Sequence, residues 1–165
     1  MEIVPAGPDT DVATEAIVDL WVDLAADQRA HGSHLDAEGN RTRIREAIVR
    51  HAVDGGVLVA RDREAGDLLG FVMFARETAT YAQDLSRGIV ENLYVRPAQR
   101  GEGVGSALLE AAEDALAERG LDAVTLEVMA ANEDARRLYR RRGYEEYRVE
   151  LEKPLASDTH SKGGK

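Results

Sequence analysis

The chain has no cysteine and very little lysine, and both features restrict its chemistry. Because none of its 165 residues is cysteine, disulfides, thiol nucleophiles and thiolate metal sites are excluded. Arginine supplies 18 of the 21 basic residues, and the three lysines (Lys153, Lys162 and Lys165) all lie near the C-terminus.

Long hydrophobic runs are also absent. No stretch reaches the roughly 18 apolar residues that a membrane-spanning helix needs. The first residues have no basic segment followed by an apolar one, so we expect no signal peptide and a cytoplasmic protein. The length and a hydrophobic content of 44% are sufficient for one domain with a buried core.

The charge is strongly negative, with 31 acidic against 21 basic residues and a formal net charge of −10. Such a surface repels nucleic acids and anionic membranes, so neither is an expected partner. Abundant carboxylates with few lysines are similar to the composition of salt-loving archaeal proteins, which stay soluble at high salt. An acidic protein from a GC-rich genome, in which arginine replaces lysine, is the alternative.

Two histidines, His31 and His34, lie close together in a polar stretch. A zinc pair on a helix would have i, i+4 spacing and further ligands nearby. Because neither condition is met, we interpret both as loop residues and predict no metal site.

The periodicity of apolar residues predicts alternating strands and helices in one domain over residues 1–153. Residues 154–165 are polar and are predicted to be a disordered tail. The predicted class is α/β with a mixed sheet, in the order β-α-α-β-β-β-α-β-α-β. Strands are expected at residues 1–6, 57–61, 68–76, 88–95, 123–129 and 144–152, and helices at residues 9–27, 41–51, 107–119 and 133–142.

A glycine-rich turn joins the strand at 88–95 to the following helix. Gly101, Gly103 and Gly105 alternate there, and such spacing lets backbone N–H groups converge on an anion at a helix N-terminus. A P-loop is rejected because no lysine follows Gly105. The dinucleotide-binding pattern Gly-x-Gly-x-x-Gly, counted from Gly101, requires glycine at a position where this chain has Ser106. A turn that binds no ligand is the remaining alternative.

Two motifs together identify a family. The turn Arg100-Gly-Glu-Gly-Val-Gly105 matches Gln/Arg-x-x-Gly-x-Gly/Ala, which resembles the acyl-CoA-binding motif of the GNAT superfamily of N-acyltransferases. Further along, Asn132, Ala135, Tyr139 and Gly143-Tyr144 resemble the second conserved block of that family. The resemblance covers nearly the whole chain, and its pattern is similar to that of ribosomal-protein alanine N-acetyltransferases.

This resemblance implies transfer of an acetyl group from acetyl-CoA to a primary amine, with no metal. It also implies a β-bulge that separates the 88–95 strand from its neighbour and frees backbone N–H groups. The residues implied to bind acetyl-CoA are Leu93, Tyr94, Val95, Arg100, Gly101, Gly103, Val104, Gly105, Ser106 and Asn132.

The resemblance also implies a general base and a general acid. Glu127 is the first choice of base, Glu91 is the second, and a water relay without either is the third possibility. Tyr139 is the implied acid toward the departing thiolate, and a purely packing role is its alternative. The arginines of residues 136–142 could approach the CoA 3′-phosphate or simply form a solvated helix face.

The acceptor is not identified by the sequence. In the family it binds near the segments that correspond to residues 28–40 and 77–87, and both are polar here. A protein N-terminus is the leading hypothesis, and a small amine such as a polyamine, amino acid or aminoglycoside is the alternative. A non-catalytic acyl-CoA sensor is a third hypothesis, and a homodimer is compatible with the family.

Overall fold

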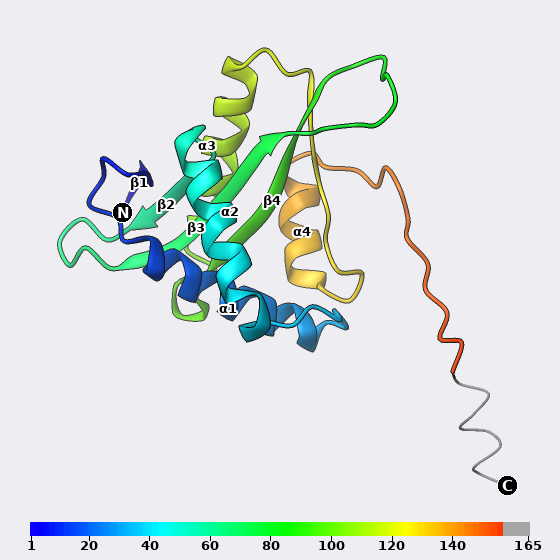
Figure 1. Ribbon diagram of the computed structural model, residues 1–165, viewed down its shortest axis with the longest axis horizontal. Coiled ribbons are helices and arrows are strands. Elements are labelled where there is room, and N and C mark those ends of the chain that lie inside the picture. The colour runs from blue at the N-terminus through cyan, green and yellow to red at the C-terminus, as the bar shows by residue number, and fades with distance from the viewer. Residues whose placement is uncertain (157–165) are drawn as a thin grey trace, which may run out of the picture.

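The strands lie side by side in the order in which they occur along the chain. The computed structural model describes residues 1–156, and within them the sheet has five strands (Figure 1). The first four pair antiparallel, and the last two pair parallel because α3 connects them as a crossover. The strands are β1 (Glu2–Pro5), β2 (Val57–Arg61), β3 (Leu68–Arg76), β4 (Arg87–Val95) and β5 (Ala123–Leu126).

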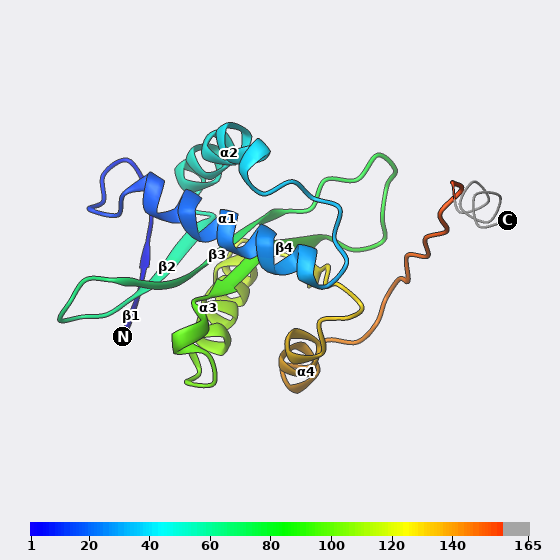
Figure 2. The same ribbon diagram turned by 90° about the horizontal axis from the view of Figure 1, so that it is seen from below.

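Helices cover both faces of the sheet (Figure 2). On one face lie α1 (Thr14–Ala30) and α2 (Arg41–Val53), and on the other lie α3 (Val104–Glu118) and α4 (Glu133–Arg141). Short 3₁₀ turns at Glu38–Asn40 and Pro97–Gln99 precede α2 and α3. The predicted mixed α/β sheet is therefore confirmed over the described residues.

Two hydrophobic clusters hold the layers together. Phe71 points from β3 into the cluster under α1 and α2, whereas Phe74 points into the cluster under α3. Both rings are fully buried, and burial of a side chain of this size contributes about 1.5–3 kcal/mol. The two clusters fix the strands on which the site is built.

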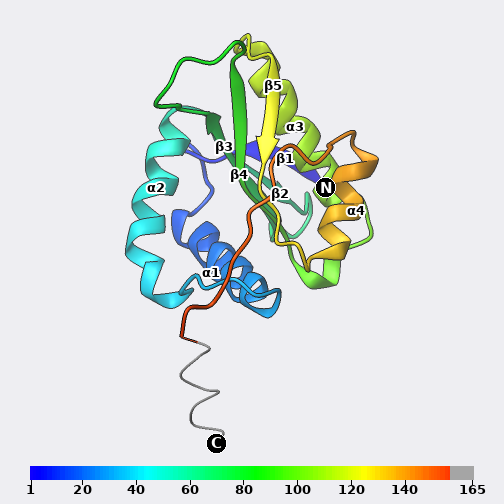
Figure 3. The same cartoon turned by 90° about the vertical axis from the view of Figure 1, so that its right-hand side faces the viewer.

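A β-bulge interrupts β4 at Glu91. Met73 pairs with Asn92 while Phe74 pairs with Val90, so Glu91 has no partner on β3. The parallel pairing of β4 with β5 ends at Val90 and Leu126, directly before the bulge. The extra residue bends the strand, and the second half of β4 has no β5 neighbour. The bulge that the resemblance implied is thus present. Figure 3 shows β5 beside β4 at the edge of the sheet.

Several predicted boundaries need correction. The first helix was predicted from residue 9 but begins at Thr14, because the hydroxyl of Thr10 closes a turn with the N–H and C=O of Gly7. It also continues to Ala30, into the predicted loop. The strand predicted to reach residue 129 ends at Leu126, since β4 bulges away and leaves nothing to pair with.

The strand predicted at residues 144–152 is wrong. This segment forms no strand, and Tyr147, Val149 and Leu151 are 71%, 68% and 89% exposed. The alternation of these apolar residues is typical of a strand, but the segment does not pair with β5. Its apolar side chains are therefore not part of a sheet face that packs on the core. Residues 157–165 of the predicted tail lie outside the described residues.

Side-chain contacts hold the 144–152 segment instead. The guanidinium of Arg136 binds Glu146 at 2.8 Å, and Arg87 lies 4.8 Å from the centre of the Tyr147 ring. At its far end, Glu152 pairs with His34 at 2.9 Å. The segment therefore passes from α4 across the start of β4 to the loop after α1. Within residues 1–156, no helix is long and apolar enough to cross a membrane.

Candidate active site

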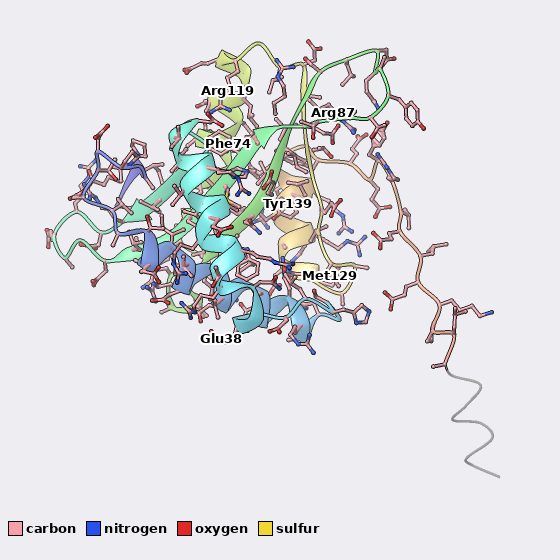
Figure 4. All side chains as sticks on the ribbon, viewed as in Figure 1. Glu38, Phe74, Arg87, Arg119, Met129 and Tyr139 are labelled. Atoms are coloured by element: carbon pink, nitrogen blue, oxygen red, sulfur yellow. The ribbon has the colours of Figure 1, made fainter. Side chains whose placement is uncertain are left out.

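The gap beyond the end of the β4–β5 pairing contains a narrow cavity. Its volume is about 60 Å³, and both strands, the loop after β5, α1 and α4 contribute to its walls. The sequence-predicted residues that line it are Glu91, Leu93, Glu127, Asn132 and Tyr139. Both candidate bases and the candidate acid are thus brought to one place. Figure 4 shows Tyr139 between Arg87, at the start of β4, and Met129, in the loop after β5.

The register of β4 decides which backbone groups face this gap. Arg96 donates its N–H to Leu69 on β3, so every second residue before it also faces β3. The N–H of Tyr94 therefore points toward β3, and those of Leu93 and Val95 point toward the gap. Of the three residues predicted from this strand, Leu93 and Val95 have the orientation that binding of the pantetheine arm requires.

The glycine turn leads directly into α3. Gly101 and Gly103 have φ angles of +81° and +84°, a conformation that only glycine adopts readily. Within residues 1–156, the N–H groups of residues 101–106 have no hydrogen-bond acceptor in the protein. Unsatisfied N–H groups at the positive end of a helix form an anion site, which fits a pyrophosphate.

Gly105 lies where α3 contacts both α4 and β4. A Cβ there would lie 3.4 Å from the Leu138 side chain and 3.5 Å from the Val95 side chain, which is ordinary van der Waals contact. At Gly103, by contrast, a Cβ would meet nothing within 4 Å, so the space above it is open.

The Arg100 side chain turns away from the glycine turn. Its guanidinium donates to Asp27 on α1 at 2.8 Å and to the carbonyl of Val95 at 3.0 Å. It also lies 5.5 Å from the centre of the Tyr94 ring. This arginine joins the end of β4 to α1, so a contact with the pyrophosphate would come from its backbone only.

Glu91 is held by a histidine that sequence reasoning did not select. Nε2 of His51, on α2, lies 3.1 Å from Oε2 of Glu91, and its Nδ1 donates to the carbonyl of Ala47 at 2.8 Å. Both ring nitrogens face acceptors, so the protonated imidazolium satisfies both. Accordingly, the hydrogen bond to Glu91 raises the pKa of His51 above its ordinary value. No local pattern indicates this pair, because the partners lie 40 positions apart on different elements.

Glu127 occupies a less structured position. It follows the last residue of β5, and its side chain is exposed with no ion pair or hydrogen bond among the described residues. Its carboxylate faces the same cavity as Glu91. It has freedom to move that the bound Glu91 does not have.

Tyr139 lies on the side of α4 that faces α3 and the sheet. Its ring packs partly against the second hydrophobic cluster and meets the Tyr144 ring edge to face at 5.9 Å. Burial raises the pKa of the Tyr139 hydroxyl to about 12, so it stays protonated at neutral pH. Asn132 caps the same helix by accepting the N–H of Ala135 at 3.2 Å, as predicted.

The arginine cluster of α4 is largely neutralised. Arg136 pairs with Glu133 and Glu146, Arg137 with Asp134, and Arg142 with Glu113. Arg140 and Arg141 have no such partner within the described part of the chain. The interpretation as an ordinary helix surface thus accounts for three of these five arginines.

A second, wider cavity adjoins the first. Its volume is about 470 Å³, within the range of small-molecule sites. The end of β3, the loop after it, the start of β4 and residue Arg148 form its walls. Among the described residues, only Glu91 lines both cavities. A carboxylate therefore stands where the two spaces meet.

The model of the Acetyltransferase (GNAT) family matches residues 15–144, which include both cavities except for Arg148. The chain belongs to this family. Its members use acetyl-CoA as co-substrate, which fits the unsatisfied N–H groups at the start of α3. Membership of this family is thereby shown, and the expected GNAT fold is confirmed.

Similar proteins carry the names of several acetyltransferases. A mycothiol acetyltransferase of Clavibacter sepedonicus is 36% identical over 90% of this chain and 46% of its own length. A streptothricin acetyltransferase of Streptomyces lavendulae is 37% identical over 48% of this chain and 39% of its own length. The chain thus spans less than half the length of these relatives.

A solved structure has the same fold. A GCN5-related N-acetyltransferase from Ralstonia eutropha aligns with a TM-score of 0.69 and 27% identity, over 94% of this chain and 98% of its own. The likeness to ribosomal-protein alanine acetyltransferases, the halophilic origin and the homodimer all stay predictions. In residues 1–156 no three His, Cys, Asp or Glu side chains are grouped to hold a metal ion.

Proposed function

We propose that this protein acetylates a small primary amine by direct attack on acetyl-CoA in a ternary complex, with Glu91 as the general base. The observation that carries the proposal is the position of Glu91 on the bulge of β4, where the two cavities meet. An amine that enters from the wider cavity would reach the thioester beside this carboxylate.

Each step has a group available on the chain. Acetyl-CoA supplies the acetyl thioester, and the free N–H groups of residues 101–106 would bind its pyrophosphate. The N–H of Leu93 would donate to the carbonyl oxygen, which becomes an oxyanion when the amine nitrogen attacks the carbon. Glu91 would accept the proton that the amine loses, and the carbon–sulfur bond then breaks.

Tyr139 would complete the reaction by protonating the leaving thiolate. Its hydroxyl is protonated at neutral pH because burial raises its pKa to about 12. A donor that holds its proton until a thiolate forms beside it is suited to this role. The tyrosine would regain its proton from solvent after the products leave.

Structure and sequence rank the two candidate bases differently. The sequence pattern favoured Glu127, which lies twelve positions before Tyr139. Glu91 is preferred here because His51 holds its Oε2 in place, and no described side chain binds its Oε1. Glu127 remains the alternative, since it lines the narrow cavity and could approach the amine from β5.

The names of the relatives bear on the acceptor. They refer to mycothiol and streptothricin, and neither name refers to a protein N-terminus. Together with the size of the wider cavity, this favours the small-amine hypothesis over the protein N-terminus that the sequence placed first. A non-catalytic sensor is disfavoured, because it would need neither the placed carboxylate nor a protonated tyrosine in the cavity.

The variants Glu91→Gln and Glu127→Gln test which glutamate is the general base, and each variant is the matched control of the other. Both keep the side-chain shape and remove proton acceptance. For the base, turnover should fall about 100-fold at neutral pH, and the deficit should shrink at high pH where free amine is abundant. If Glu127→Gln shows this pattern and Glu91→Gln does not, the base lies on β5. If no amine is acetylated by the unaltered protein, the proposed function itself fails.

A further inference from the structure

Two arginines without acidic partners line the wider cavity. Arg76 is the last residue of β3, and its guanidinium makes no ion pair or hydrogen bond among the described residues. Arg148 comes from the segment after α4, and its guanidinium lies 5.8 Å from the centre of the Tyr147 ring without binding a carboxylate. Both guanidinium groups therefore keep donors free for a ligand.

The other charges of this cavity are already balanced. Arg87 binds Glu77 at 2.7 Å, and Glu91 is paired with His51. What remains uncompensated is the positive charge of Arg76 and Arg148. The positive excess of this cavity is opposite in sign to the net charge of the whole chain, which is −10.

Residues on both sides of Arg148 in the sequence contact other parts of the protein. Glu146 is bound by Arg136 from α4, and the Tyr147 ring lies against the Arg87 guanidinium at the cavity wall. Four residues later, Glu152 is bound by His34. These contacts bring Arg148 of this segment to the cavity wall, although no described strand pairs with the segment. This gives a reason for the segment to cross the molecule with its apolar side chains exposed.

We propose that Arg76 and Arg148 form an anion subsite for the acetyl acceptor. The acceptor is then a small primary amine that also carries a carboxylate or a phosphate. A guanidinium binds either group through paired N–H donors, and an anion held there leaves the amine free to reach Glu91 at the other end of the cavity. The position of the amine rests on the function proposed above, whereas the anion subsite does not.

The charge of the wider cavity bears on which small amine fits it. The chain as a whole is acidic, yet the cavity beside the candidate base carries the opposite charge. A polyamine would place additional positive charge against Arg76 and Arg148. An amine with a terminal anion has the matching charge at both ends.

Matched pairs of amines test the subsite. We would measure acetylation of 4-aminobutyrate against 4-aminobutanamide, and of phosphoethanolamine against ethanolamine, because each pair differs only in the anionic group. The variants are Arg76→Gln and Arg148→Gln. Arg63→Gln is the control, since Arg63 is an exposed arginine in the turn after β2 that lines neither cavity.

In at least one pair, the anionic amine should have a lower KM than its uncharged partner. Whether this is the carboxylate pair or the phosphate pair shows which anion the subsite prefers. Arg76→Gln and Arg148→Gln should each raise that KM about 10-fold or more, the loss expected for a charge-assisted hydrogen bond. The KM of the uncharged partner and of acetyl-CoA should stay unchanged, and Arg63→Gln should have no effect. Both arginines are exposed, so the variants should keep their melting temperature.

Calorimetric titration of the CoA-loaded protein with the same amines separates the two proposals. If an anionic amine binds and Arg76→Gln weakens it, the subsite stands even when no acetyl transfer occurs. The subsite is refuted, while the acetyltransferase function stands, if the uncharged amines are acetylated with the same KM as the anionic ones and neither arginine variant changes these KM values. Failure of both anionic amines to bind also refutes it.

Discussion

Glutamate substitutions at Gly103 and Gly120 would separate phosphate binding from backbone strain. The two glycines lie at opposite ends of α3, with φ angles of +84° and +78°, and a Cβ at either would meet nothing within 4 Å. An L-residue in this conformation costs about 1–2 kcal/mol, so the strain should be similar at both. For a protein of this size, that lowers the melting temperature by about 2–4 °C per kcal/mol.

The added charge acts differently at the two ends. At Gly103 a carboxylate would lie beside the N–H groups of α3, and if it stands about 5 Å from a phosphate charge, repulsion costs about 1–3 kcal/mol. The dissociation constant for CoA should then rise roughly 5- to 150-fold. The helix dipole favours a carboxylate at this end and disfavours one at Gly120, by about 0.3–1 kcal/mol. Gly103→Glu should thus be the more stable variant and the weaker binder.

Calorimetric titration with CoA and thermal melting would measure both quantities at one fixed salt concentration. Gly120→Glu should bind CoA with the affinity of the unaltered protein despite its lower melting temperature. Wild-type affinity in Gly103→Glu would refute the assignment of the glycine turn to the pyrophosphate. An equal loss in both variants would show that affinity depends on the stability of α3 rather than on the turn.

Two further outcomes are expected. Tyr139→Phe removes only the hydroxyl, so turnover should fall about 10- to 1,000-fold with little change in acetyl-CoA affinity or melting temperature; earlier melting at unchanged turnover would instead indicate a packing role. Raising KCl from about 0.1 M to 2 M shortens the Debye length from about 10 Å to about 2–3 Å. The melting temperature should rise, because the repulsion between carboxylates in a chain of net charge −10 is then screened. A melting temperature that does not depend on salt would leave only codon bias to explain the composition.

Local pattern was sufficient where an element depends on its own residues. Strands β2 and β3 have the predicted bounds, because their apolar residues face both clusters and Gly66, with φ of +78°, permits the turn between them. The cap of α4 by Asn132 was predicted for the same reason, since its hydrogen bond to Ala135 spans three residues. In each case the deciding contact lies close in the sequence or repeats regularly along it.

The segment at residues 144–152 shows where local pattern fails. Alternating apolar residues specify that a strand could form, but not that a sheet edge is available to it. Here the side chains of Glu146, Tyr147 and Glu152 find partners on α4, β4 and the loop after α1, and the backbone follows those contacts. A sequence pattern with period two does not reveal such partners.

The proposed acceptor subsite depends on the same segment, residues 144–152, and on its not pairing as a strand. If residues 144–152 formed a strand of the sheet, backbone pairing would determine which face Arg148 lies on. Tyr147, Val149 and Leu151 would lie on the opposite face. Without the ladder, Arg148 reaches the cavity that Arg76 and Glu91 also line. The pairing of His51 with Glu91 arises in the same way, from the packing of α2 over the bulge of β4. Family motifs predict the acetyl-CoA side of the proposed site, whereas the proposed acceptor side depends on contacts between residues far apart in the sequence. The structure therefore adds most on the acceptor side.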